Sequence, residues 1–379
     1  MPDSIRRRSF LGTGAAAAAS FIASEADAAP RISYKRQTAA SPDLLKVGVV
    51  LGRHRSHTNV IWHRFTNPPP GSARRTGMII THFWTNWDDT AEEFATKTGA
   101  QRVKKLDGMI GKVDGVIIDE AHATTLQHPA AIPYIETGIP TFVNRPFSSS
   151  MRNAKKMVDI ARKNETPLMS GSSFEYIKEA GAAKHFVQRD KLKAYEVING
   201  SDDYYTHGLH GMWFAYACVG GGVKRISTLS QKWWKGPALT SIEHKPREKN
   251  GEPVYGIVRH GITTGGYCGI RVYGPDYREF ISGPDGQGWV VDQGLWAPML
   301  IAMEQMFMTG KQPESYDDIL EKTKIFLASF RSVLELNGSI VELDSFDDNW
   351  DAGPMRPEHY PESSYTSDEL KVYEKVLKG

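Results

Sequence analysis

Basic, acidic and amide side chains follow the ends of three short apolar runs in this chain. These runs end at Leu51, Ile118 and Val143, and each has the composition of a buried strand. Residues 112–147 predict a strand, a helix over 125–137 and a second strand, so the strands should be parallel, with their carboxyl ends at one edge where ligands bind. The residues expected at this edge are Arg53, His54, Arg55, His57, Asp119, Glu120, His122, Asn144 and Arg145.

Two kinds of chemistry suit these residue types. Arginine binds carboxylates and stabilises oxyanions, and histidine exchanges protons near neutral pH. Aromatic faces such as Trp213 suit a sugar ring, although they would suit the core of a helix-covered sheet equally well. The residues predicted to bind substrate are Arg53, Arg55, His54, His57, His122, Asn144 and Trp213.

A divalent metal is a second use for the same groups, because carboxylates and imidazoles are metal ligands. No H-x-x-x-H or H-E-x-x-H spacing supports such a site on one helix. The metal therefore stays an alternative, and its candidate ligands are Asp119, His122, His207 and His210.

Composition bounds the class of protein. With 379 residues, of which 40% are hydrophobic and 24% charged, the chain has ample core for one to three domains. A formal net charge of +2 gives no basis for nucleic acid as a partner, and no long apolar run follows the N-terminus, so we expect no membrane insertion. Cys218 and Cys268 fall in apolar runs, which favours two buried free thiols over a disulfide.

The N-terminus has the pattern of a targeting segment. Arg7-Arg8 with Phe10-Leu11 precedes an alanine-rich stretch, and Ala26-Asp27-Ala28 offers a small-x-small cleavage site. We therefore predict a twin-arginine signal over residues 1–28, a linker over 29–43, and a periplasmic or extracellular location.

The remaining chain divides into two domains and an arm. Residues 44–178 alternate strands and helices, which predicts an α/β domain with a doubly wound parallel sheet. Its predicted strands are 46–51, 78–81, a short one at 103, 116–118, 141–143 and 168–170, and its helical segments are 59–65, 88–97, 106–110, 125–137 and 150–163. Residues 179–345 predict an α+β domain with an open, mainly antiparallel sheet covered by helices on one face. Its predicted strands are 193–199, 225–233, 255–260, 269–273 and 278–281, and its helices are 204–217, 298–308 and 315–336. Residues 346–379 are predicted to form a C-terminal arm.

The stretch from 112 to 147 also resembles a known family. His128, Ala131 and Gly138 match the helix pattern of the Gfo/Idh/MocA family, of glucose–fructose oxidoreductase and inositol dehydrogenase, and Asn144-Arg145-Pro146 stands where that family has Glu-Lys-Pro. The resemblance extends from about residue 45 to about 336. It implies a Rossmann-like first domain that binds NAD(P), the open-sheet second domain, and a homo-oligomer formed through the open face of that sheet.

Three positions depart from the cofactor-binding pattern of the family. Gly52 aligns with the first glycine of G-x-G-x-x-G, but His54 and His57 stand at the second and third. No acidic residue ends the second strand, and Arg145 replaces a lysine, although arginine cannot release its proton. The loop is therefore degenerate, with Gly52 as its one retained cofactor-binding residue, and NAD(P) is disfavoured without being excluded.

The second domain retains part of the family's catalytic motif. The family pattern D-x-G-x-H corresponds to residues 206–210, so His210 matches the catalytic acid–base histidine and Gly208 the glycine, while Thr206 replaces the aspartate. The predicted catalytic residues are His210, Tyr205, His207 and Arg145.

These residues support three hypotheses of function. The first is an exported, non-redox enzyme that performs β-elimination or epimerisation on a uronate-containing sugar, with arginines neutralising the carboxylate. The alternative is the activity implied by the resemblance: an NAD(P)-dependent sugar oxidoreductase or a redox-assisted glycosidase. The third is a sugar-binding protein without catalysis. Each takes a small carbohydrate or a glycan as its partner.

Overall fold

The computed structural model describes residues 44–53, 56–72, 76–120, 124–189, 191–200, 204–230, 236–249, 251–261, 268–282 and 295–353, and five residues between 366 and 375. The predicted signal segment, the linker and most of the predicted arm lie outside these residues. Among the described helices, none has the length and apolarity that crossing a membrane requires.

The first sheet is parallel throughout and positions the expected site. Its six strands are β1 (Leu45–Leu51), β2 (Met78–Trp84), β3 (Gln101–Arg102), β4 (Gly115–Asp119), β5 (Thr141–Val143) and β6 (Leu168–Met169). They lie in the order β3-β2-β1-β4-β5-β6, which confirms the doubly wound, Rossmann-like prediction. The strand order reverses between β1 and β4, so a ligand crevice is expected beyond their carboxyl ends. Strand β2 runs three residues past its predicted end because Phe83 and Trp84 are buried.

The helices of this domain match the predicted ones closely. After β1 come a π-helix, η1 (Thr58–Trp62), and α1 (His63–Thr66); the others are α2 (Asp88–Thr98), α3 (Gln127–Glu136) and α4 (Met151–Lys163), with short 3-10 turns η2 (Leu106–Met109) and η3 (Thr124–Leu126). Ser150 caps α4 by accepting a hydrogen bond from the Asn153 amide, 3.4 Å away. Gly99 ends α2 in the left-handed conformation, which glycine adopts without strain.

The second sheet is mixed and has seven strands. In chain order they are β7 (Ala194–Asn199), β8 (Val223–Ser230), β9 (Ala238–His244), β10 (Tyr255–His260), β11 (Cys268–Tyr273), β12 (Tyr277–Ser282) and β13 (Val341–Glu342). Their order is β12-β11-β7-β10-β9-β8-β13, and β7 and β10 form its one parallel pair among the described strands. The sequence did not predict β9, where Thr240, Ser241 and Glu243 dilute the apolar pattern.

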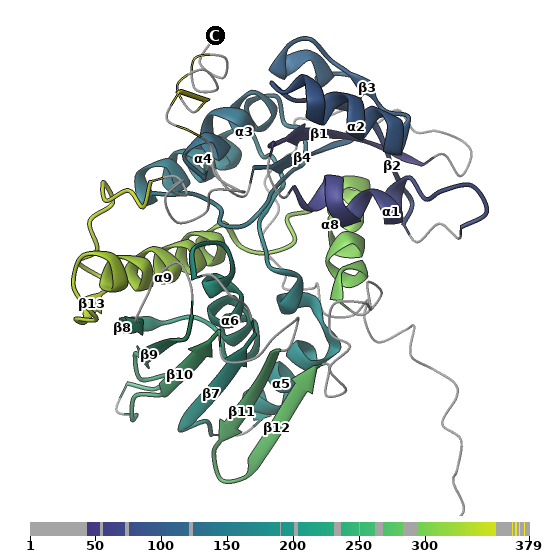
Figure 1. Cartoon of the computed structure of the whole chain (residues 1–379). Coiled ribbons are helices and arrows are strands. Elements are labelled where there is room, and N and C mark those ends of the chain that lie inside the picture. Colours follow the sequence, from purple (N-terminus) through teal and green to yellow (C-terminus); the bar gives the residue numbers. More distant parts are fainter. Residues whose placement is uncertain are drawn as a thin grey trace, which may run out of the picture. The chain divides into compact units, whose positions relative to one another are not determined.

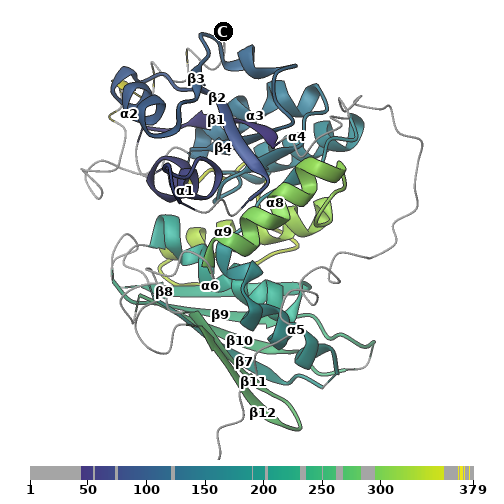
Figure 2. The ribbon, with the colours of Figure 1, turned by 90° about the vertical axis from the view of Figure 1, so that its right-hand side faces the viewer.

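Helices cover one face of this sheet, as predicted (Figures 1 and 2). They are α5 (Lys178–Arg189), which the sequence did not predict, α6 (Tyr204–Val219) and α9 (Tyr316–Leu334). Helix α6 lies on β7 and β10, α5 on β11 and β12, and α9 on β8. The other face is open, and its exposed apolar residues include Leu229, Leu239, Tyr255, Ile257, Tyr273 and Tyr277.

Helices α8 (Ala297–Thr309) and α9 lie between the two sheets in both views (Figures 1 and 2). Helix α8 returns to the first domain, where the ring of Phe307 lies against Gly115 of β4 and Glu304 accepts a hydrogen bond from the Gly77 amide at 2.8 Å. One hydrophobic core therefore runs through β1, β2, α6, α8 and α9. This shared core holds the carboxyl ends of the parallel strands close to α6.

The start of the predicted arm packs on the chain itself. Phe346 and Trp350 are buried, and the backbone carbonyl of Asp348 accepts a hydrogen bond at 2.8 Å from the backbone amide of Arg152 in α4. Elsewhere in the core, Cys218 and Cys268 are both buried thiols and not a disulfide, as predicted.

Candidate functional site

At the reversal of strand order, a carboxyl group lies against the backbone that follows β1. Gly52 follows β1 and Glu120 follows β4, and a Cβ atom added at Gly52 would lie 2.3 Å from the Glu120 Oε2 atom. Glu120 is fully buried. The backbone of Gly52 does not have a positive φ, so its conformation alone does not require glycine. The contact with Glu120 supplies the requirement.

A second buried carboxylate, Asp119, fixes the start of the first helix. Its Oδ2 atom accepts hydrogen bonds from the Thr58 amide at 2.7 Å and from the Ser56 hydroxyl, and its Oδ1 atom accepts one from Asn144 Nδ2 at 2.6 Å. A carboxylate at this point suits the partial positive charge of a helix N-terminus. Asp119 is therefore a structural anchor, and three donors surround it instead of a metal ion.

A directed chain of hydrogen bonds runs from Arg145 to Asp119. The Arg145 guanidinium can only donate, so His57 Nε2, 3.0 Å away, must accept. The Nδ1 atom of His57 lies 3.0 Å from Asn144 Nδ2 and 3.3 Å from Asn144 Oδ1; with Nε2 accepting from Arg145, a neutral ring carries its proton on Nδ1 and donates it to Oδ1. Asn144 in turn donates to Asp119. Both nitrogens of His57 are thus engaged, and its ring lies 5.0 Å from that of Trp296 and 5.1 Å from that of Trp62.

His210, on α6, faces this chain from the second domain. Its Nδ1 atom lies 2.6 Å from the hydroxyl of Ser172, and its ring lies 5.4 Å from those of Phe174 and His207. Complete burial lowers the pKa of His210 well below its usual value, and the positive charges of Arg145 and the neighbouring histidines lower that pKa further. His210 is therefore neutral near pH 7 and can accept a proton.

The structure brings together part of the predicted set. Arg145, His57, His207 and His210 lie close enough to interact electrostatically, and Asn144 joins them through His57. Arg53 lies elsewhere: it pairs with Asp89 at 3.0 Å and with Glu369, and its guanidinium lies 5.0 Å from the ring of Trp87. The positions that lie outside the described residues are His54, Arg55, His122 and the side chain of Tyr205.

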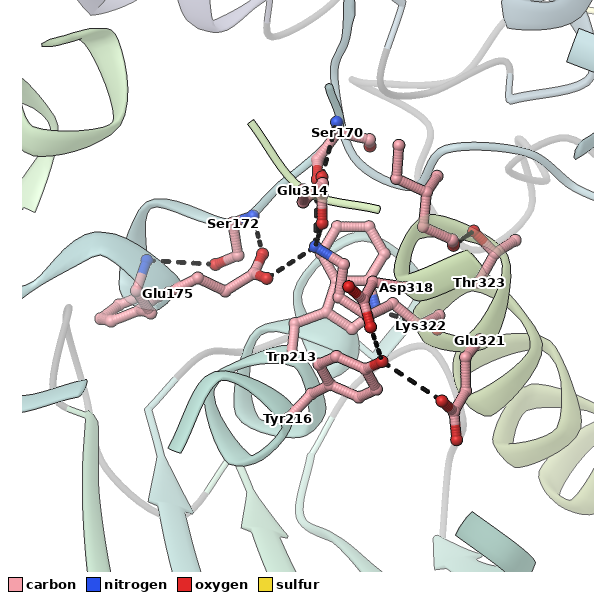
Figure 3. Close-up of polar contacts among 12 residues, drawn as sticks. Ser170, Ser172, Glu175, Trp213, Tyr216, Glu314, Asp318, Glu321, Lys322 and Thr323 are labelled. Carbon is pink, nitrogen blue, oxygen red and sulfur yellow. Dashed lines mark hydrogen bonds and ion pairs between the residues drawn. The ribbon is translucent and has the colours of Figure 1, made fainter. Parts of the chain in front are cut away.

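The prediction that Trp213 binds substrate is wrong. Its side chain is 1% exposed, its Nε1 atom donates to the Lys322 carbonyl at 3.1 Å, and its ring lies 5.1 Å from the Lys322 ammonium (Figure 3). The indole packs between α6 and α9, so it belongs to the helix-covered core that the sequence left open as the alternative.

The metal alternative finds no support among the described residues. In this part of the chain no group of three or more histidine, cysteine or acidic side chains could hold an ion. Asp119 is satisfied by its donors, and the Nδ1 atom of His210 is held by Ser172.

Sequence reasoning missed two residues of this site. Ser172 follows β6 and contacts His210, and Trp296 precedes α8 and packs on His57. A signal for Ser172 was present, because Ser172 and Glu175 form the S-x-x-E spacing of a capping box, which the structure contains in full. No local pattern marks Trp296, since it reaches the site only through the packing of α8.

Comparison with protein families identifies the first domain. Residues 54–172 match the model of the GFO_IDH_MocA family, described as an oxidoreductase family with an NAD-binding Rossmann fold. The predicted resemblance to the Gfo/Idh/MocA family is thereby confirmed for this part of the chain. The match begins inside the loop after β1, so it leaves out Gly52. No curated protein matches the whole sequence significantly.

Solved structures extend the likeness to both domains of the chain. It is similar to myo-inositol dehydrogenase from Lactobacillus casei in complex with NAD(H) and myo-inositol, with 13% identity, a TM-score of 0.65, and coverage of 79% of this chain and 96% of that one. A probable dehydrogenase from Thermotoga maritima is 15% identical with a TM-score of 0.63, and the match covers 80% of this chain and 100% of that one. An oxidoreductase from Agrobacterium radiobacter in complex with NAD+, L-tartaric acid and magnesium is 16% identical with a TM-score of 0.61. The match covers 79% of this chain and 99% of that one. At these identities the likeness establishes the fold.

The residues at Gly52 do not fit the dinucleotide that the family implies. A Rossmann domain holds the pyrophosphate over the glycine loop and the following helix N-terminus. Here the Glu120 carboxylate lies on Gly52, and the Asp119 carboxylate already accepts the Thr58 amide of that helix. Two buried carboxyl groups thus stand where a doubly charged pyrophosphate would bind.

Proposed function

We propose that this protein is a sugar or cyclitol oxidoreductase in which His210 exchanges the proton of a substrate hydroxyl. The observation that carries the proposal is a neutral, buried imidazole beside a permanently charged guanidinium, on an oxidoreductase scaffold. Similar solved proteins are named as dehydrogenases, and one holds NAD(H) and myo-inositol. These findings favour oxidoreduction over the non-redox hypothesis that the loop residues suggested first.

The proton step follows from the residues of the site. The Nε2 atom of His210 takes the hydroxyl proton of the substrate; its lowered pKa leaves the ring unprotonated, and so able to accept, at neutral pH. Arg145 stabilises the developing alkoxide by charge, and its bond to His57 holds the guanidinium in place. The oxidation also needs an acceptor for the hydride of the substrate carbon; a nicotinamide dinucleotide would supply it, and with Glu120 on Gly52 it would have to be held by contacts other than those of the glycine loop.

Turnover of sugars and cyclitols with NAD+ or NADP+ tests this function. The absorbance of reduced nicotinamide should appear for at least one polyol, and His210→Ala should abolish it. The matched control is His185→Ala, because His185 is exposed on α5. Absence of turnover across a broad panel, at concentrations of NAD(P)+ that saturate any binding, would contradict the proposal.

The contact of Glu120 with Gly52 favours a second candidate. Without a dinucleotide, the same base and guanidinium suit proton abstraction beside a carboxylate, which is the chemistry of uronate β-elimination or epimerisation. Incubation with uronate-containing glycans should then yield the absorbance of an unsaturated product, or a changed sugar configuration by NMR. Glycans without a carboxylate serve as the control and should not react.

We also propose export by the twin-arginine route, with residues 1–28 as the signal. The paired arginines at 7 and 8 support it. In a bacterial host with this pathway, the exported protein should have lost a segment ending near residue 28, as judged by N-terminal sequencing. Arg7→Lys with Arg8→Lys should keep the protein inside the cell. Export of that double variant would count against the route.

A further inference from the structure

Ser172 joins His210 to a buried network in the body of the protein. Its hydroxyl lies 2.6 Å from His210 Nδ1 and accepts a hydrogen bond from the Phe174 amide at 3.3 Å. Its own amide donates to Glu175 Oε1 at 2.6 Å, so Ser172 and Glu175 form a capping box at the turn after β6. The contacts of the hydroxyl are buried and that of the amide is partly buried, and together they fix the side chain and the backbone of Ser172.

The capping box is held in turn by a buried cation from α9. The Lys322 ammonium lies 2.7 Å from Glu175 Oε2 and 2.7 Å from Glu314, and it donates to the Ser170 carbonyl at 3.2 Å (Figure 3). The Lys322 side chain is 2% exposed. Because such a charge is costly to bury without partners, this arrangement strongly favours one position for Glu175.

We propose that Ser172 is a positioning residue that keeps the Nδ1 proton on neutral His210 and presents Nε2 as the base, and that Lys322 fixes Ser172 through Glu175. This rests on the proposed function of His210. A neutral imidazole carries one proton, and Nε2 can act as a base only when that proton is on Nδ1. The Ser172 oxygen accepts from the Phe174 amide, and its 2.6 Å contact with Nδ1 allows either direction; in the proposed arrangement Ser172 accepts the Nδ1 proton and its own hydroxyl proton points away from the ring.

A hydroxyl in this place gives a different base from a carboxylate. The charged or titratable groups facing His210 are Arg145 after β5, His57 after β1, His207 on α6 and His260 on β10, and all of them disfavour the imidazolium. A carboxylate on Nδ1 would oppose that effect and raise the pKa of the ring. Ser172 accepts the proton without adding charge, so His210 stays unprotonated until substrate supplies a proton.

The chain offers a matched control for the test. Ser173 is 2% exposed, and among the described residues its hydroxyl makes no hydrogen bond. Ser173→Ala therefore removes the same group from the neighbouring position without touching His210. Ser172→Ala should lower kcat about tenfold with little change in KM, which is the effect of one hydrogen bond. Ser172→Thr keeps the hydroxyl and should restore most of kcat.

The nitrogen NMR signals of His210 give a readout that needs no substrate. In the full chain with labelled histidine, neutral His210 should show a protonated Nδ1 and an unprotonated Nε2. In Ser172→Ala the tautomers should mix, and Ser173→Ala should leave them unchanged. A neutral ring protonated on Nε2 in the wild type, or equal spectra for the two alanine variants, would overturn the proposal. If no polyol is turned over, the proposed function fails while the spectra still judge the role of Ser172.

A double-mutant cycle tests the link to α9. Glu175→Gln keeps an acceptor for the Ser172 amide but removes the charge that Lys322 holds. On its own Glu175→Gln should lower kcat, but in the Ser172→Ala background it should lower kcat little further, because both changes loosen the same contact. Fully additive losses would show that Glu175 acts on stability alone and would refute the part of the proposal that concerns Lys322.

Discussion

Removal of the Glu120 carboxylate should open the crevice to a dinucleotide. A phosphate oxygen that contacts the Gly52 backbone would approach Glu120, because a Cβ at Gly52 already lies 2.3 Å from Oε2. Two like charges about 4 Å apart repel by about 4 kcal/mol at an effective dielectric constant of about 20. That repulsion corresponds to about a thousandfold in affinity. Glu120→Gln removes the charge and keeps the volume, whereas Glu120→Ala removes both.

Titration calorimetry with NAD+ measures the effect. We expect affinity to rise from wild type to Glu120→Gln to Glu120→Ala, by up to about a thousandfold. Glu92→Gln is the control, because Glu92 is exposed on α2. Tight NAD+ binding by the wild type that Glu120→Gln leaves unchanged would refute the reasoning. Weak NAD+ binding by the wild type would be compatible with the oxidoreductase. If the wild type does not bind NAD+ and Glu120→Ala does, the result would favour the non-redox candidate.

Two further predictions concern stability and assembly. Lys322→Met should destabilise the fold by about 3–5 kcal/mol, because it leaves Glu175 and Glu314 buried without their cation. Burial raises the pKa of Glu175 to about 7 even with Lys322 in place, and loss of the cation would raise that pKa further. Wild type and variant therefore hold the same Glu175 proton in acid, and the deficit in urea unfolding should grow as pH rises through about 7; a deficit independent of pH would contradict this origin. We also propose that the open sheet face joins copies of the chain: light scattering should show an oligomer, and Ile257→Glu, on that face, should dissociate it. A wild-type monomer would exclude this interface.

The sequence predicted the first domain well because its strands are fully buried and its helices carry clear ends. The strands at 116–118 and 141–143 were located to within a residue, since parallel strands covered on both faces read as apolar runs. The second sheet was harder: the sequence of β9, Ala-Leu-Thr-Ser-Ile-Glu-His, mixes apolar and polar residues without a period of two, and α5 shows no strong boundary after Tyr176. Local patterns of that kind do not separate a strand or helix from a loop.

At the site, residue types were predictable but their partners were not. Arg145, His57 and His210 lie where strand ends and a matched motif placed them. The anchoring of Asp119 by Thr58 and the contact of Glu120 with Gly52 depend on side-chain packing across the β1–β4 edge, which no spacing in the sequence encodes. The burial of Trp213 has the same cause, because α9 covers it from a distant part of the chain.

The most direct test of the central claim compares His210→Ala with His185→Ala for polyol turnover in the presence of NAD(P)+, with substrate binding measured in parallel. The account predicts that the exposed control keeps full activity, whereas His210→Ala binds substrate and loses turnover by a hundredfold or more, the usual contribution of a general base. Turnover that survives in His210→Ala would contradict it. So would a wild type that binds a sugar and never converts it, which would make the protein a binding protein.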